Sequence, residues 1–233
     1  MKRFYTAAAA TAERGVTLDG RPLRTPARAL LTVPTDALAA AIAAEWNAQG
    51  DRIDPRAMPL TGLANAAIDR VAPDPKAFAR SLSVFAESEL LAYRAEGPAP
   101  LLARQAAVWD PLLDWARQRY DIGFTLITGI LHVPQPPATL ARINAAYAAF
   151  DAFRLAALNP VVTICGSAVI GLAVAEARLD AEAAWEAGQL DELWQAEQWG
   201  KDPLAEAAER ERRNGLAAAV RFLSLADASG SAP

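Results

Sequence analysis

The spacing of hydrophobic and polar residues changes after about residue 55 of the chain. Before that point the apolar residues come in short runs, such as "VTL" and "ALLTV", which are typical of β-strands. The Asp19-Gly20 pair between "VTL" and "RPL" is a strong hairpin signal, because these residue types tolerate positive φ. Thr35 precedes a stretch with helical spacing that stops at Gly50, so we expect a helix capped by Thr35. Residues 1–58 are therefore expected to form a small α+β domain with antiparallel strands.

The rest of the chain, residues 59–233, has apolar positions at helical spacing and almost no strand signal. Proline lacks an amide N–H, so we expect Pro111 and the Asn159-Pro160 pair to break helices. The expected helices cover residues 61–71, 75–93, a segment ending near 109, 110–120, 138–158 and 161–178, with three more from Asp180 interrupted at Gly188 and Asp202-Pro203. The tail "ADASGSAP" is expected to be irregular. The predicted fold class is α+β, a small N-terminal β-containing domain followed by a larger, mainly α-helical domain.

The composition is that of an ordinary globular protein and argues against several classes of function. The chain has 233 residues, of which 53% are apolar and 21% charged, and its formal net charge is −4 at pH 7. An acidic balance argues against sequence-independent nucleic-acid binding, which needs a basic surface. The run "VVTICGSAVIGLAVA" is too short to span a bilayer and predicts a buried helix. Because the N-terminus lacks the apolar run of a signal peptide, we expect a cytoplasmic protein without membrane insertion.

Residues that commonly carry catalysis are scarce. One histidine and one cysteine leave no two-histidine or cysteine-rich metal site, and the chain has no phosphate-binding loop, so we expect no cofactor. Cys165 lies in an apolar run and is expected to be a buried thiol, whereas His132 is expected to be a hydrogen-bonded loop residue. On a helix, Glu87 and Glu89 would point away from each other. They are expected to be solvated or capping charges, although one must lie close to an apolar face.

The segment "LDELWQAEQWG" concentrates tryptophans and carboxylates near the end of the chain. We expect Leu193 and Trp194 to be buried, and Glu192 to be accessible or to line a groove, with Gln195 and Trp199 beside it. A helix that is covered on both sides remains an alternative to an exposed surface of aromatic and polar residues, the composition found in interface anchors. Helical spacing places Leu190, Leu193, Trp194 and Glu197 on one side, and Glu192, Gln195, Ala196 and Trp199 on the other.

Several long sequence blocks, spread over nearly the whole chain and in the right order, resemble a known family. The resemblance is to the assembly chaperones that bind the free α subunit of the F-type ATP synthase catalytic sector. The blocks are "KRFY", "LDGRPLRTP" (Leu18–Pro26), "AAEWNAQGDRIDPRAMPLTGLANAAID" (Ala43–Asp69), "SELLAYRA" (Ser88–Ala95), "QAAVWDPLLDWA" (Gln105–Ala116) and "LDELWQAEQWG".

The resemblance implies a holding chaperone that is not an enzyme. Such a chaperone binds the unassembled α subunit and shields its interface until the β subunit replaces it. The critical acidic residue of the family matches Glu192, so the implied partner-binding residues are Glu192, Gln195 and Trp199. Two other functions remain open from the residues themselves. One is a carboxylate-dependent hydrolase that uses Glu192 with Glu87 or Glu89, and the other is a generic protein-interaction adaptor.

Overall fold

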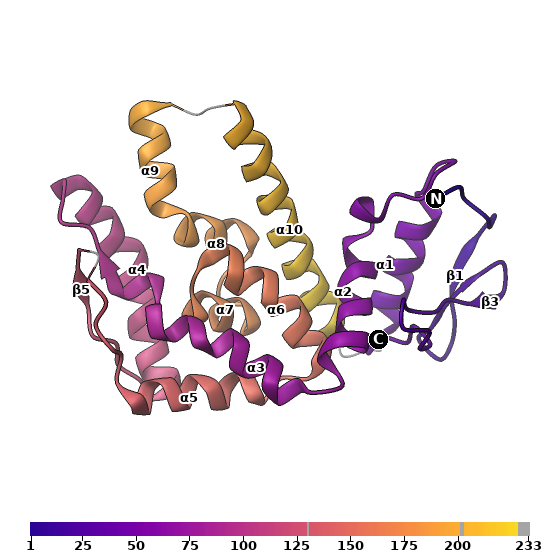
Figure 1. Cartoon of the computed structure of the whole chain (residues 1–233), viewed down its shortest axis with the longest axis horizontal. Helices are drawn as coiled ribbons and strands as arrows, with labels where there is room; N and C mark the ends of the chain where they lie inside the picture. Colours follow the sequence, from indigo (N-terminus) through magenta and orange to yellow (C-terminus); the bar gives the residue numbers. More distant parts are fainter. Residues whose placement is uncertain (130, 201–202, 228–233) are drawn as a thin grey trace, which may run out of the picture. The chain divides into compact units, whose positions relative to one another are not determined.

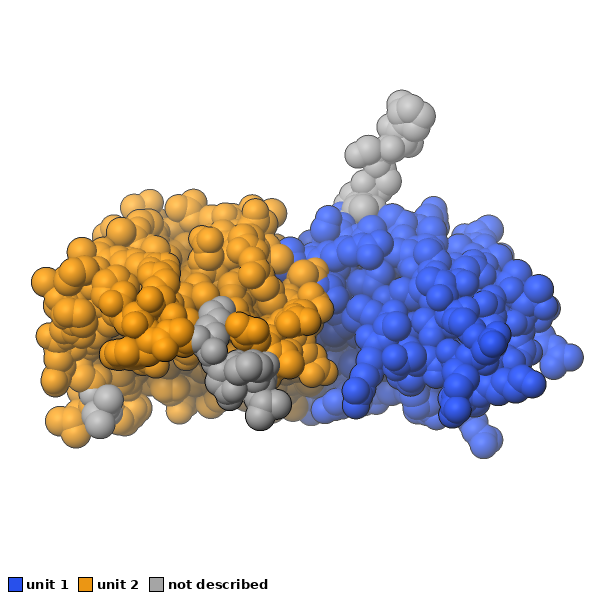
Figure 2. All heavy atoms as spheres, turned by 90° about the horizontal axis from the view of Figure 1, so that it is seen from above, with its two compact units in different colours: residues 1–75, 151–157, 218–233 blue, residues 76–150, 158–217 orange. Residues whose placement is uncertain are grey.

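The computed structural model describes residues 1–129, 131–200 and 203–227, and it confirms the expected fold class (Figure 1). Short strands near the N-terminus precede a larger helical region. The chain forms two compact units, which Figure 2 shows in different colours. Unit 1 comprises residues 1–75, 151–157 and 218–233, and unit 2 comprises residues 76–150 and 158–217. These units do not coincide with the expected division after residue 58, which stays a prediction.

Unit 1 contains the β-hairpin that the Asp19-Gly20 pair predicts. Asp19 and Gly20 have φ angles of 48° and 79°, and Leu18 pairs with Arg21 across the turn. The Asp19 carboxylate also accepts hydrogen bonds from the backbone N–H groups of Thr6 and Ala7, each at 2.9 Å, which ties the turn to the residues just before the first strand. The elements are β1 (Ala8–Ala10), β2 (Val16–Leu18), β3 (Arg21–Pro22), α1 (Asp36–Asn47), η1 (Pro55–Ala57), α2 (Pro59–Ala66) and the π-helical turn η2 (Ala67–Val71).

Helix α1 packs against β1 and β2 and supplies much of the core of unit 1. Its buried side chains include Leu38, Ile42 and Trp46. The predicted cap is confirmed, because Thr35 Oγ1 accepts a hydrogen bond from the Leu38 N–H at 3.1 Å. The stretch expected as a strand, residues 29–33, forms isolated bridges instead of a named strand.

Unit 2 is built mainly from helices around one that is buried on every side. All eight residues of α7 (Ala168–Ala175) are buried, and Tyr147 donates a hydrogen bond to the Ala168 carbonyl at 2.8 Å. A Cβ on Gly188 would lie 2.7 Å from Cys165 Cβ, so the glycine permits this close approach. The elements mainly in unit 2 are α3 (Pro75–Ser83), η3 (Val84–Ser88), η4 (Leu90–Ala92), β4 (Tyr93–Arg94), α4 (Ala99–Tyr120), β5 (Ile127–Thr128), α5 (Pro137–Ala148), α6 (Ala152–Cys165), α7 (Ala168–Ala175), α8 (Ala181–Gly188), α9 (Leu190–Trp199) and α10 (Pro203–Asp227), of which α3, α6 and α10 have residues in both units.

Two predicted helix breaks at proline are wrong. Helix α4 runs through Pro111, and α6 runs through Pro160. The break expected at the Asn159-Pro160 pair lies instead at residues 149–151, between α5 and α6. An interior proline costs about 3 kcal/mol. At Pro111 the buried side chains of Trp109 and Leu112 on either side of it offset that cost.

Two further helix predictions differ in extent. The helix expected to reach residue 93 ends at Ser83 and continues as 3-10 turns. The apolar run from Val161 is not one helix, because Gly166 has a φ of 64° and Ser167 caps a new helix. Residues 201–202 and 228–233, which include part of the last predicted break and most of the predicted tail, lie outside the described residues. Within the described ranges, no helix is both long and apolar enough to cross a membrane.

Candidate functional site on helix α9

Helix α9 follows α8 directly and is anchored at its first turn. Gln189, at its N-cap position, donates a side-chain hydrogen bond to the Ile164 carbonyl at 2.9 Å. Leu190 is the buried residue of the helix. The helix ends at Gly200, whose φ of 81° suits a residue without a side chain. Its base is therefore fixed in unit 2, and the rest of the helix is packed less completely.

One side of α9 is tied to α4 by polar contacts. The fully buried Gln105 of α4 donates to Asp191 at 2.8 Å and accepts from the Ala95 N–H at 3.0 Å. Arg104 donates to both carboxylate oxygens of Glu197, each at 2.8 Å. Asp191 and Glu197 therefore face α4.

The three side chains expected to bind a partner lie in the open on α9. Glu192, Gln195 and Trp199 are all exposed, and Trp199 is 79% exposed. Within the described part of the chain, these three side chains have no hydrogen bond or ion pair. We refer to Glu192, Gln195 and Trp199 as the α9 face. An exposed tryptophan with a carboxylate and an amide beside it can bind another protein through apolar contact and directed polar bonds.

The expected burial of the opposite side is wrong. Leu193 and Trp194 are half-buried, and the only buried residue of α9 is Leu190. The side of α9 that carries Leu193, Trp194 and Glu197 turns towards α4, because Glu197 forms an ion pair with Arg104. That side is covered only in part, because the contacts of α9 with α8 and α4 leave Leu193 and Trp194 partly exposed. Truncating Leu193 to alanine is consequently not expected to open a core cavity.

Glu89 does not share an environment with the other two carboxylates of the hydrolase alternative. Glu89 is fully buried, whereas Glu87 and Glu192 are exposed. Burial raises the pKa of Glu89 to about 7. Hydrogen bonds to its carboxylate, including one from the Val169 N–H at 3.2 Å, act in the opposite direction and lower the pKa. A pair of catalytic carboxyl groups must face one substrate. Glu89 has no access to a substrate that Glu192 could reach from the surface.

The surroundings of Cys165 and His132 fit structural roles for both side chains. Cys165 is buried as predicted, and burial raises the pKa of its thiol to about 12, so it stays protonated. His132 lies in a loop with Nδ1 3.3 Å from the Tyr93 hydroxyl. Among the described residues, no group of three or more His, Cys, Asp or Glu side chains could hold a metal ion.

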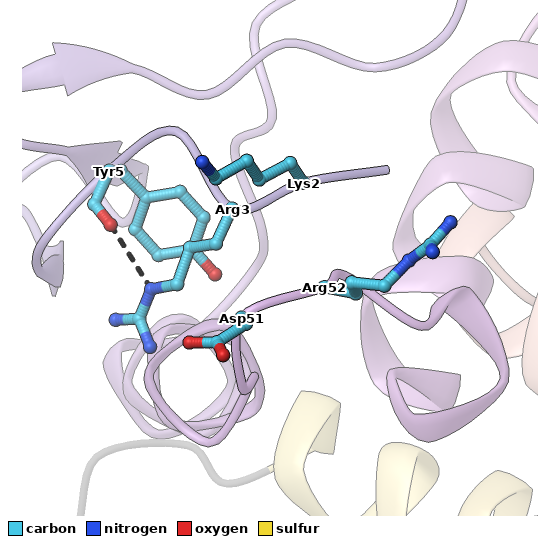
Figure 3. Close-up of a pocket in the computed structure, with 5 residues that line it drawn as sticks. All are labelled: Lys2, Arg3, Tyr5, Asp51 and Arg52. Carbon is cyan, nitrogen blue, oxygen red and sulfur yellow. Dashed lines mark hydrogen bonds between the residues drawn. The ribbon is translucent and has the colours of Figure 1, made fainter.

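A basic hollow in unit 1 does not have the geometry of an anion site. Its lining includes Lys2, Arg3, Asp51 and Arg52. Figure 3 shows the Lys2 and Arg52 side chains pointing in opposite directions. Arg3 donates instead to the backbone carbonyls of Tyr5, Thr6 and Gln49. The three cations therefore do not converge on one ligand.

Several residues in the blocks that carry the family resemblance stabilise unit 1. The Glu45 carboxylate accepts hydrogen bonds from the Leu60 N–H and from both the N–H and the hydroxyl of Thr61, each at 2.8 Å. It thereby satisfies free amides at the start of α2. Asp69 accepts a hydrogen bond from the Thr25 hydroxyl at 2.6 Å. Sequence reasoning missed these roles, since the contacts join segments far apart in the chain.

Comparisons with known proteins agree with this fold. A family model described as "ATP12 chaperone protein" matches residues 2–117. The Schizosaccharomyces pombe protein named "Protein atp12, mitochondrial" is 25% identical over 235 residues, covering 94% of this chain and 81% of that protein. The crystal structure of Atp12 from Paracoccus denitrificans has a TM-score of 0.90 and 42% identity, covering 97% of this chain and 98% of that one. The Atu1473 protein of Agrobacterium tumefaciens has a TM-score of 0.89 and 40% identity, covering 96% and 85%.

The expected family is confirmed by these comparisons. Sequence identity of 42% over nearly the full length of both chains, together with a TM-score of 0.90, means that this chain and the Paracoccus protein share their fold from end to end. The chain therefore belongs to the ATP12 chaperone family and is a chaperone of ATP synthase assembly.

Proposed function

We propose that the protein binds the unassembled α subunit of the F-type ATP synthase through the α9 face and shields its interface until the β subunit replaces it. The observation that carries the proposal is the exposure of Glu192, Gln195 and Trp199, which have no side-chain partner within the described residues. The family resemblance, which matches the critical acid to Glu192, supports the same surface.

The composition of the α9 face fits a chaperone that must release its partner. A subunit without its neighbours exposes an apolar interface that self-associates. A holding chaperone must cover that interface, and the β subunit must still be able to displace it. Trp199 offers a large apolar contact area, whereas Glu192 and Gln195 are polar groups that remain solvated in the free protein. A mixed surface of this kind binds with moderate affinity and dissociates without leaving a large apolar patch exposed.

The substitution Glu192→Lys is expected to abolish protection of the α subunit and leave the fold intact. Reversing the charge places a cation where the partner meets a carboxylate, and like charges at an interface oppose binding. Because Glu192 is exposed, its replacement should change the free energy of unfolding by no more than about 0.5 kcal/mol. The measurement is light scattering of isolated α subunit with each chaperone variant, together with a thermal melt of each variant. The matched control is Glu211→Lys, which makes the same charge change at an exposed position of α10.

Isolated β subunit serves as the specificity control for the same assay. The proposal requires protection of the α subunit by the wild-type protein and by the Glu211→Lys variant, with no comparable protection of β. Full protection by a stable Glu192→Lys variant would mean that Glu192 is only a solvated charge. Equal protection of α and β would favour a generic interaction domain.

A further inference from the structure

A groove of ≈ 660 Å³ in unit 2 is lined in part by a residue of α9. Its lining includes Tyr93 and Arg94 of β4, Glu96, Gly129 and Asp191. Asp191 belongs to α9 and immediately precedes Glu192, so the groove reaches the helix that carries the α9 face.

The groove is acidic, because Arg94, the one cationic residue given above for its lining, is already paired with a carboxylate. The Arg94 guanidinium forms an ion pair with Asp110 at 2.6 Å and lies 5.3 Å from the ring centre of Trp109. Glu96 and Asp191 have no cationic partner among the described residues. The Glu96 carboxylate lies against Gly129, where an added Cβ would be 2.9 Å from Glu96 Oε1. Two unneutralised carboxylates in a groove are complementary to a basic side chain.

The loop that contacts the groove carries two exposed apolar side chains. Leu131 is 78% exposed and Val133 is 38% exposed. They stand on either side of His132, whose Nδ1 is 3.3 Å from the hydroxyl of the groove residue Tyr93. This contact holds the loop beside the groove. Two exposed aliphatic side chains on a loop that contacts the groove offer apolar contact area to another protein.

The α9 face is too small to be the whole interface. A specific interface buries about 800 Å² on each partner, and even a large aromatic side chain supplies only about 150–250 Å². The α9 face contains one such side chain, Trp199. The contact must therefore extend onto neighbouring surface, and the groove adjoins α9 through Asp191.

We propose that the groove and the apolar loop residues Leu131 and Val133 form a second contact for the same partner, and that they receive a basic side chain flanked by aliphatic residues. Glu96 and Asp191 bind the cation, while Leu131 and Val133 cover the aliphatic residues. This inference rests on the proposed binding of the α subunit, and it assigns to the partner a segment of defined chemistry.

The test uses the full chain with three substitutions and isolated α subunit. Leu131→Asp and Glu96→Lys are each expected to weaken binding at least about tenfold, as measured by biolayer interferometry. Both residues are exposed, so thermal melts should match the wild-type protein. Val84→Asp is the matched control for Leu131→Asp, because Val84 is a 50% exposed aliphatic residue of the same unit.

The outcomes separate this inference from the proposed function. Weaker binding by Leu131→Asp and Glu96→Lys, with Val84→Asp unchanged, supports the second contact. If Glu192→Lys abolishes binding while Leu131→Asp and Glu96→Lys bind normally, the second contact is wrong and the proposed function stands. If the wild-type protein does not bind the α subunit, both are overturned.

Discussion

Replacing Trp109 with alanine is expected to lower the free energy of unfolding by about 3–5 kcal/mol. Trp109 is fully buried, and its Nε1–H donates a hydrogen bond to the Ala187 carbonyl at 2.9 Å. The substitution leaves a cavity under the Arg94 guanidinium and removes the donor from a buried carbonyl, so both losses act in the same direction. Urea denaturation followed by circular dichroism measures the change directly.

Trp199→Ala is the matched control, because it removes the same side chain from a 79% exposed position. Its free energy of unfolding should stay within about 0.5 kcal/mol of the wild-type value. Binding of the α subunit should show the complementary result, with a clear loss for Trp199→Ala at temperatures where it is folded. Similar losses of stability in the two variants would show that Trp199 packs into the fold and is not part of an open surface.

The stability of the protein is expected to fall as pH rises from about 4.5 to about 7, and Glu89 is the cause. Burial raises the pKa of Glu89 from 4.5 to about 7, whereas hydrogen bonds from Ser167 and from the Val169 and Leu91 N–H groups act in the opposite direction. Between these two pH values the folded protein holds a proton that the unfolded chain has lost, so raising the pH favours unfolding. At about 1.4 kcal/mol per pKa unit, the loss over this window is roughly 3 kcal/mol.

The variant Glu89→Gln tests this assignment, because an amide does not titrate. Urea denaturation at several values between pH 4.5 and 8 should show a smaller slope for Glu89→Gln than for the wild-type protein. Glu87→Gln, an exposed neighbour, should keep the wild-type slope. Burial also raises the pKa values of Tyr147 and Cys165, so neither titrates in this window. An unchanged slope in Glu89→Gln would assign the pH dependence to other groups.

The parts of the fold that depend on local signals could be predicted from the sequence. The turn at Asp19-Gly20 and the cap at Thr35 each depend on the conformational preference or hydrogen bonding of a few adjacent residues. The breaks at Pro111 and Pro160 were wrong, since packing by distant residues decides whether a helix tolerates proline.

For the candidate site too, the sequence predicted what depends on neighbouring residues and missed what depends on distant ones. The helical period places Glu192, Gln195 and Trp199 on one face, and the structure leaves all three exposed. The same period could not show that Leu193 would be only half-buried, because burial depends on which other helices cover that side. The sequence likewise could not distinguish Glu89 from Glu87, as the buried position of Glu89 comes from α7, far along the chain.

Photo-cross-linking from position 195 is the most direct test of the claim that the α9 face binds the α subunit. A photoreactive amino acid replaces Gln195, which is exposed and lies between Glu192 and Trp199 on the α9 face. The same group at position 211 on α10 serves as the reference. The account predicts that irradiation of the complex joins the α subunit to position 195 and not to position 211. Cross-linking from position 211 alone, or equally from both positions, would contradict it.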